Sequence, residues 1–248
     1  MPKLLFIGGL HRSGTSLIHK AIAEHPDISG FSDTEVPEDE GQHLQTIYPK
    51  ASFYGGPGKF GFDSESALDE SSSLITPTNA ERIFKQWSDY WDLSKAVLVE
   101  KSPPNLTKTR FLQALFPESY FLIIMRHPVV VSYATKKWSQ TSLYSLLRHW
   151  VICHERFEAD RPFLERCMVI RYEDFVKDLS KSLNQVFEFV GVSPFDSSFQ
   201  ASEAHNQKYY QRWEKLGKIP LVSFYRQFLI RSFEEEIQKF GYSFCDLP

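Results

Sequence analysis

Four short apolar runs, each followed by glycine-rich or charged residues, constrain the fold of this chain more than any other feature. The runs cover 3–7, 96–99, 120–125 and 167–170. Between them, apolar residues recur at helical spacing, as in the segment that follows the first run and ends at His25. Continuous apolar strands separated by helices are typical of a parallel sheet that is covered on both faces. The pattern therefore predicts a three-layer α/β fold with about four or five parallel strands.

The composition agrees with one packed domain and excludes several other classes. The 248 residues are 42% hydrophobic and 24% charged, so we expect a single folded domain over 1–248 rather than a disordered chain. The 28 basic and 31 acidic residues give a net charge of −3. This balance provides no overall attraction for nucleic acid or an acidic membrane, although it leaves room for a local basic pocket.

The cysteines and the hydropathy predict a soluble protein of a reducing compartment. Three cysteines occur, at 153, 167 and 245, and their spacing fits neither a disulfide framework nor a zinc site. The first apolar run is too short for a signal peptide and lacks a small-residue cleavage site. No window approaches the ~20 apolar residues of a membrane span. We therefore expect a cytoplasmic protein with no membrane span and no nucleic-acid partner.

Polar residues follow each of the four runs directly. The segments are 9–14, 100–102, 126–128 and 171–174. In open α/β sheets, ligands bind outside the carboxyl ends of the strands. We therefore expect these four segments to meet in one crevice.

The first of these segments has the frame of a phosphate-binding loop. Gly9 and Gly14 enclose four residues between a predicted strand and a predicted helix, and Thr15 and Ser16 follow. Such a loop turns backbone N–H groups and a helix N-terminus toward an anion, which predicts a P-loop-like fold. Where an ATP-binding loop has Lys, this one has Thr15, and its cation is Arg12. The loop suits a smaller 5′-phosphoryl group bound without a metal; a glycine-rich turn without a ligand is the alternative.

Arg126 supplies a second cation at the end of a predicted strand. A guanidinium in this position can hold a phosphate by two parallel hydrogen bonds. The alternative is an arginine that caps the sheet or pairs with Glu173.

Together, these segments resemble the sulfotransferases that use 3′-phosphoadenosine 5′-phosphosulfate (PAPS). The resemblance rests on four motifs in order, at 12–16, 100–103, 126–128 and 171–174. The Arg-Ser-Gly-Thr of the first motif is similar to the bacterial and tyrosylprotein-type branch of the family. The resemblance covers nearly the whole chain. It implies an enzyme that transfers the sulfuryl group of PAPS to a hydroxyl or amine acceptor by in-line displacement.

The resemblance implies that the glycine-rich loop holds the 5′-phosphosulfate of PAPS. Arg12 would lie near the bridging or sulfuryl oxygens. The backbone amides of Ser13, Gly14, Thr15 and Ser16 would bind the 5′-phosphate.

The resemblance also implies that Arg126 binds the 3′-phosphate, which distinguishes PAPS from other adenylates. The serine that the family has eight residues later is Ala134 in this chain. Ser132, or another hydroxyl such as that of Thr135, would then take its place.

Two later residues are similar to nucleotide-binding residues of the family. Tyr172 is similar to an adenine-side residue, with a core aromatic as the alternative. The segment 205–210 is similar to a late loop that closes over the nucleotide. Within it, Lys208 is the best cation for the 3′-phosphate, with a solvated basic loop as the alternative.

Sulfuryl transfer requires cations beside the leaving phosphate and a base beside the acceptor. Arg12 and Lys101 are predicted for the first task, and because these cations neutralise the charge we expect no metal. In the related families the base is a Glu or His after the first helix, which points to the acid-rich segment 33–43.

Within that segment we expect Glu38 to be the base, because Pro37 rigidifies its approach. Glu40 and His43 are the next candidates. Most of the remaining acids should be solvated bystanders, as is usual for a run of charges.

Two other functions stay open on the sequence alone. One is a P-loop nucleotide kinase that uses ATP and needs Mg²⁺, and the other is a non-catalytic nucleotide-binding protein of the same fold. The acceptor molecule is unidentified, and its selection is expected to depend on 30–78 and on the helical segments of 138–157. The sequence does not predict the oligomeric state.

Overall fold

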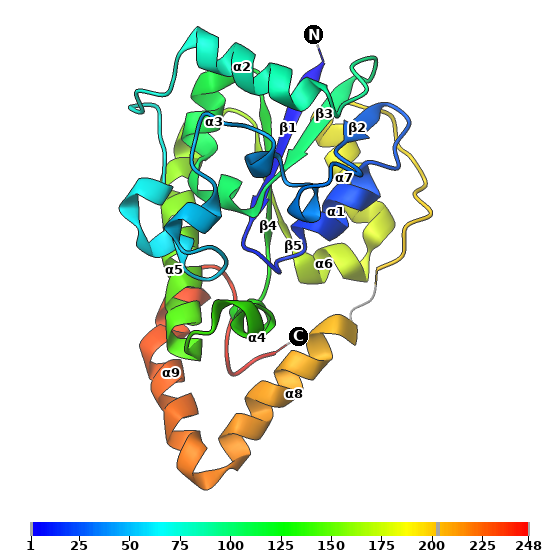
Figure 1. The fold of residues 1–248 in the computed structure, drawn as a ribbon. Helices are drawn as coiled ribbons and strands as arrows, with labels where there is room; N and C mark the ends of the chain where they lie inside the picture. Colours follow the sequence, from blue (N-terminus) through cyan, green and yellow to red (C-terminus); the bar gives the residue numbers. More distant parts are fainter. Residues whose placement is uncertain (1, 202–203, 248) are drawn as a thin grey trace.

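The computed structural model describes residues 2–201 and 204–247, and it contains the predicted sheet (Figure 1). Five strands, all parallel, lie in the order β2-β3-β1-β4-β5. The strands are β1 (Lys3–Gly9), β2 (Ile28–Gly30), β3 (Val97–Lys101), β4 (Tyr120–Met125) and β5 (Cys167–Arg171). Four of them are the apolar runs of the sequence, which confirms the predicted fold class. Strand β2 has no counterpart in the prediction, because three residues are too few to show a pattern.

The central strand β1 shows why the runs are apolar throughout. Leu5 and Ile7 face one side of the sheet, Phe6 faces the other, and all three are fully buried. On the side of Leu5 the covering helices are α1 (Thr15–Ile22), α6 (Tyr172–Lys177) and α7 (Leu179–Val190). On the side of Phe6 they are α2 (Pro77–Ser88), α3 (Thr109–Leu115), α4 (Pro128–Ser139) and α5 (Leu143–Asp160). The predicted three layers are therefore confirmed.

The segment 205–210, which we expected to be a loop, is helical. It belongs to α8 (Ala204–Lys218), and α9 (Pro220–Gln238) follows it directly. The two helices form a hairpin that projects from the rest of the protein (Figure 1). On its inner side, Trp213 and Leu229 are buried in the same apolar cluster as Trp150 of α5. The expectation of a loop rested on the polar residues at the start of this segment, whereas Tyr210 at its end is buried in the same cluster.

The long segment between β2 and α2 is packed against the protein. It contains several short 3-10 helices. Phe31, Tyr48 and Phe60 from this segment are buried in the apolar clusters on the α2–α5 side of the sheet. The segment is therefore fixed in place at the carboxyl ends of the strands, next to the region where a ligand is expected.

Lys108 is a buried cation within this packing. It is only 2% exposed, and its Nζ has no hydrogen-bond partner among the residues that the structure describes. Burial lowers the pKa of its ammonium from 10.5 to about 8. We predict that Lys108→Met raises the free energy of unfolding by about 2–3 kcal/mol at pH 7, because the substitution removes a buried charge and keeps an unbranched chain.

This gain should depend on pH in a defined direction. Since the pKa is depressed in the folded protein, the unfolded chain binds more protons between pH 8 and 10.5. The gain is therefore complete below pH 8 and shrinks as the pH rises toward 10.5. Urea unfolding at several pH values checks this, with the exposed Lys85→Met as the control. An unchanged stability at pH 7, or a gain that does not vary with pH, would contradict it.

Candidate active site

The loop between β1 and α1 borders a cavity of about 230 Å³ at the carboxyl ends of the strands, which we call the loop cavity. Arg12 and Gly14 adopt left-handed backbone conformations, with φ of 71° and 107°, as the chain turns into α1. The first turn of a helix leaves its amides without acceptors inside the helix, so those of Thr15 and Ser16 are available to an anion. The residues that line the loop cavity include Arg12, Gly14, Thr15, Ser16, Glu38, Arg126, Ala134, Tyr172, Lys208 and Tyr209.

Arg126 follows β4 and is held by contacts from two other segments. Its Nε and Nη2 donate to Oδ1 of Asn206 at 3.1 and 2.5 Å, and its Nη1 donates to the carbonyl of Arg12 at 2.9 Å. Its guanidinium lies 3.7 Å from the centre of the Tyr172 ring. Burial lowers the pKa of Arg126, while Tyr172 and Glu173 oppose that change. A guanidinium keeps its charge in proteins, so Arg126 presents a fixed cation to the cavity.

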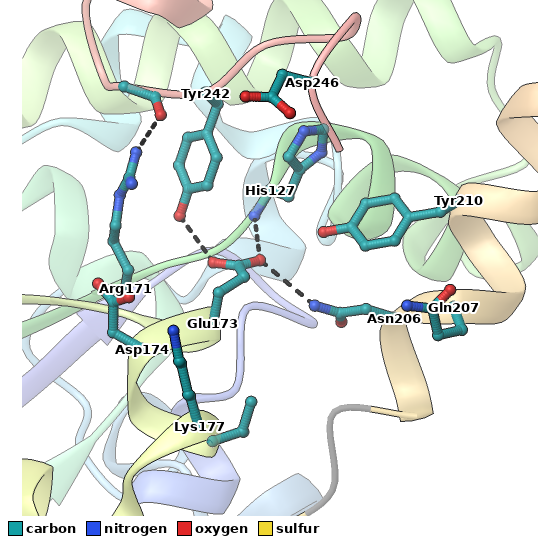
Figure 2. Close-up of a pocket in the computed structure, with 12 residues that line it drawn as sticks. His127, Arg171, Glu173, Asp174, Lys177, Asn206, Gln207, Tyr210, Tyr242 and Asp246 are labelled. Atoms are coloured by element: carbon teal, nitrogen blue, oxygen red, sulfur yellow. Dashed lines mark hydrogen bonds between the residues drawn. The ribbon is translucent and has the colours of Figure 1, made fainter. Parts of the chain in front are cut away.

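Figure 2 shows that Glu173 contacts Asn206 and is itself held by two further hydrogen bonds. Glu173 accepts hydrogen bonds from the backbone N–H of His127 at 3.0 Å and from the hydroxyl of Tyr242 at 3.0 Å. It also accepts one from Nδ2 of Asn206 at 3.5 Å. Asn206 therefore stands between Arg126 and Glu173, and it is the amide rather than the carboxylate that contacts the guanidinium. His127, Glu173, Asn206 and Tyr242 border a neighbouring cavity of about 480 Å³.

Lys101, the last residue of β3, is a fully buried ammonium between the loop and the acidic segment. Its Nζ donates to the carbonyl of Glu38 at 2.5 Å and to Oγ of Ser16 at 3.3 Å, and it lies 3.6 Å from Oε1 of Glu40. Burial lowers the pKa of Lys101, and Glu40 is the first of the carboxylates that oppose this. Burial also raises the pKa of Glu40, against the effect of Lys101. The two groups thus form a buried ion pair in which each partner stabilises the charge of the other.

A second cavity of about 270 Å³, which we call the carboxylate cavity, adjoins the first. Arg12, Thr15, Ser16 and Glu38 line both cavities. The other residues of the carboxylate cavity include His11, Pro37, Glu40, Gln42, His43, Pro57, Pro103 and Trp138. The shared wall separates a space rich in cations from a space that contains two carboxylates.

Glu38 lies at the boundary of the two cavities in a strained backbone. It adopts a left-handed conformation with φ of 56°, as do Asp33, Glu35 and Asp39 nearby. Its Oε2 accepts a hydrogen bond from Oγ of Ser16 at 3.2 Å. Left-handed backbone in residues other than glycine is costly and concentrates at functional sites.

His43 lies beside Glu40 in the carboxylate cavity. Its Nε2 is 3.8 Å from Oε2 of Glu40. Burial lowers the pKa of His43, and Lys50 and Lys101 act in the same direction. The imidazole is therefore mostly neutral at pH 7.

The structure brings most of the predicted residues together. Arg12, Gly14, Thr15 and Ser16 of the loop line the loop cavity together with Arg126, Tyr172 and Lys208, and the three candidate bases border the carboxylate cavity. Ser13 and Lys101 are buried and line neither cavity, and the backbone N–H of Ser13 donates to the carbonyl of Leu10 at 2.9 Å. Ser132 is placed elsewhere: it is buried, its Oγ has no partner among the described residues, and it lines neither of these two cavities. On the same helix, Ala134 faces the loop cavity instead.

Two contacts of the site were not predicted, although Asn206 lies in the segment 205–210 and Trp138 in the segment 138–157. Asn206 is the direct partner of Arg126, and the ring of Trp138 lies 4.5 Å from the Arg12 guanidinium. The sequence could have predicted that Trp138 lies near the site, because Trp138 is one helical turn after Ala134 and therefore on the same face of α4. The segment 205–210 was expected near the nucleotide, but the contact of Asn206 with Arg126 could not be predicted, because it depends on where α8 packs.

Comparisons with known proteins identify the family of this chain. Residues 2–197 match the Sulfotransferase family, so the chain belongs to this family. Protein-tyrosine sulfotransferase 2 of Gallus gallus is 24% identical over 218 residues, which cover 82% of this chain and 54% of that protein. The protein-tyrosine sulfotransferase of Drosophila melanogaster is 24% identical over 221 residues, which cover 84% of this chain and 41% of that protein. The chain thus spans about half the length of these relatives.

Solved structures share the fold. The sulfotransferase from Alicyclobacillus acidocaldarius has a TM-score of 0.53 at 17% identity, over 86% of this chain and 91% of that one. A sulfotransferase from Mycobacterium tuberculosis H37Rv has a TM-score of 0.51 at 15% identity, over 86% of this chain and 72% of that one. In the part of the chain that the structure describes, the helices are too short or too polar to span a membrane.

Gly14 allows Tyr172 to lie against the loop. A Cβ on Gly14 would lie 2.5 Å from Cδ2 of Tyr172. We predict that Gly14→Ala lowers the free energy of unfolding by roughly 2–4 kcal/mol, since the ring must move and the left-handed backbone is strained. Gly56→Ala is the matched control, because Gly56 is also left-handed but its nearest neighbour would be 3.9 Å from a Cβ. That variant should lose only about 1 kcal/mol in urea unfolding. Equal losses of stability in the two variants would show that the Tyr172 ring moves aside at no cost in free energy.

Proposed function

We propose that this protein transfers the sulfuryl group of PAPS to a hydroxyl or amine acceptor. The observation that carries the proposal is the pair of adjoining cavities with a common wall of Arg12, Thr15, Ser16 and Glu38. A group transfer needs its donor and acceptor on opposite sides of one point, with cations toward the leaving group and a base toward the acceptor. The two cavities meet these needs in one place.

In this proposal the loop cavity holds the donor. The amides of Gly14, Thr15 and Ser16 bind the 5′-phosphate, Arg12 lies beside the sulfuryl oxygens, and Tyr172 lies on the adenine side. The N–H of Ser13, which donates to the carbonyl of Leu10, is left out of this set. Arg126 binds the 3′-phosphate with help from Lys208, which lines the same cavity. Ser132 could join them only if α4 shifted on nucleotide binding.

The carboxylate cavity then receives the acceptor. The acceptor oxygen or nitrogen attacks sulfur, and the bond between sulfur and the bridging oxygen breaks, leaving its electron pair on the 5′-phosphate. The proton of the acceptor passes to Glu38, which lines both cavities. Arg12 and Lys101 stabilise the charge that develops on the leaving phosphate. Because these cations supply the neutralisation, we propose that the reaction proceeds without a metal ion.

Glu40 and His43 are the other candidates for the base. Glu40 is only 5% exposed, and its carboxylate lies 3.6 Å from the ammonium of Lys101, which suits an electrostatic role. We therefore propose that Glu40 holds Lys101 in its charged form.

The three free cysteines support a reducing location, and we propose that residues 1–248 act as one sulfotransferase domain in the cytoplasm.

The base is tested by transfer of radiolabelled sulfate from PAPS into fractionated cell extract in the presence of EDTA. We predict that Glu38→Gln lowers turnover by about 10²–10⁴-fold and leaves nucleotide affinity within a few-fold of the wild type, as expected for a lost general base. The exposed Glu35→Gln from the same segment is the control. Full activity of Glu38→Gln would move the role to Glu40 or His43.

Arg126→Ala should remove the preference for a 3′-phosphate. Loss of a charge-assisted contact is expected to weaken adenosine 3′,5′-bisphosphate binding by roughly 30-fold or more and to leave 5′-AMP binding nearly unchanged. Thermal shift titration of both ligands measures this. The control is the half-exposed Arg161→Ala, whose partner is Glu158. Equal losses for the two ligands would show that Arg126 does not contact the 3′-phosphate.

A further inference from the structure

The far end of the α8–α9 hairpin presents large apolar side chains to solvent. We call residues 215–231 the hairpin tip. Phe224 is 77% exposed, Phe228 is 51% exposed and Ile219 is 50% exposed. Phe224 and Phe228 are one helical turn apart, so they share a face of α9. Figure 1 shows that this end of the hairpin points away from the sheet and its covering helices.

The hairpin tip also has a strongly biased charge. Between Glu214 and Glu234 the sequence contains four basic residues and no acidic one. The basic residues are Lys215, Lys218, Arg226 and Arg231. Lys215, Lys218 and Arg231 are exposed, whereas Arg226 stacks 5.1 Å from the centre of the Trp213 ring. In a chain with a net charge of −3, this segment is therefore a local positive patch around exposed aromatic rings.

The inner side of the hairpin provides its buried packing against the protein. The inner side of the hairpin already buries Trp213, Leu229 and Phe233 in the cluster that contains Trp150. Phe228 stacks on the ring of Tyr144 of α5, with 5.6 Å between the ring centres, but half of its surface stays exposed. Phe224, which is 77% exposed, is not explained by packing within the described structure. An exposed apolar patch with a polar rim marks a surface of interaction.

The charge decides between the possible occupants of this surface. Two copies that met tip to tip would bring four cations against four, which is unfavourable. A protein partner would need an acidic recess that matches a projecting tip. A bilayer with anionic lipid needs no such match: rings enter the headgroup region while Lys and Arg contact the phosphates.

We propose that the hairpin tip docks the protein onto the surface of a membrane that contains anionic phospholipid. The other end of α8 carries Asn206 and Lys208 at the loop cavity. A 15-residue helix is about 22 Å long. When the tip is docked, the loop cavity therefore lies about 20 Å from the lipid, measured along α8. This docking is independent of the proposed chemistry.

The test is co-sedimentation of the whole chain with vesicles of phosphatidylcholine alone or of equal parts phosphatidylcholine and phosphatidylglycerol. The protein should bind the mixed vesicles, bind phosphatidylcholine far less, and dissociate as salt is added. Lys215→Gln with Lys218→Gln should weaken binding roughly 30-fold, as expected for two surface cations. Phe224→Ser with Phe228→Ser should weaken it roughly tenfold or more.

Phe53→Ser is the matched control, because Phe53 is 74% exposed but belongs to the segment 51–54 and not to the hairpin. It should bind as the wild type does. Since all these side chains are exposed, thermal unfolding should be nearly unchanged in the lysine variant and in Phe53→Ser. It should fall only slightly in the phenylalanine variant, which also loses the contact between Phe228 and Tyr144. Failure of the wild type to bind the mixed vesicles would overturn the proposal, as would binding that survives both pairs of substitutions. A change in oligomeric state of the tip variants by light scattering, without a loss of vesicle binding, would identify the tip as a contact between copies instead.

Discussion

The buried ammonium of Lys101 is the interaction on which the rest of the site depends. Removing such a charge from water costs several kcal/mol unless it is paired and hydrogen-bonded. The compensation comes from Ser16 on α1 and from Glu38 and Glu40 on the segment after β2. One charge at the end of β3 thus fixes the anion-binding loop against the acidic segment. It sets the distance between the cationic and the carboxylate sides of the site.

The contacts of Lys101 help to hold the acidic segment in a strained backbone conformation. Four of its residues, including Glu38 and Asp39, have left-handed backbone conformations, each of which costs on the order of 1 kcal/mol. Asp39 accepts hydrogen bonds from the backbone and the hydroxyl of Thr34, and Lys101 binds the carbonyl of Glu38. The packed core supplies the stability that lets this segment persist. As a result, Glu38 faces both cavities rather than extending into solvent.

The sequence was sufficient to predict the parts of the site that follow directly from the sheet. Lys101 ends a strand and Arg12, Arg126 and Tyr172 follow closely after one, and parallel strands place their carboxyl ends together. Contacts that depend on packing between distant segments were not predictable in this way. Asn206 reaches Arg126 across 80 positions, and its helix was expected to be a loop. For the same reason the hydroxyl expected from Ser132 points elsewhere, because local spacing does not fix the rotation of α4 against the sheet.

Calorimetric titration of the whole chain with adenosine 3′,5′-bisphosphate, 5′-AMP and Mg-ATP is the most direct test that the loop cavity is built for a PAPS-like donor. Arg126 and Lys208 both line this cavity, and in the proposed function they bind the 3′-phosphate, which 5′-AMP lacks. The bisphosphate should therefore bind roughly 30-fold or more tightly than 5′-AMP, and this preference should persist without Mg²⁺. Tighter binding of Mg-ATP, or equal affinity for the bisphosphate and 5′-AMP, would contradict the assignment of this cavity to the sulfuryl donor.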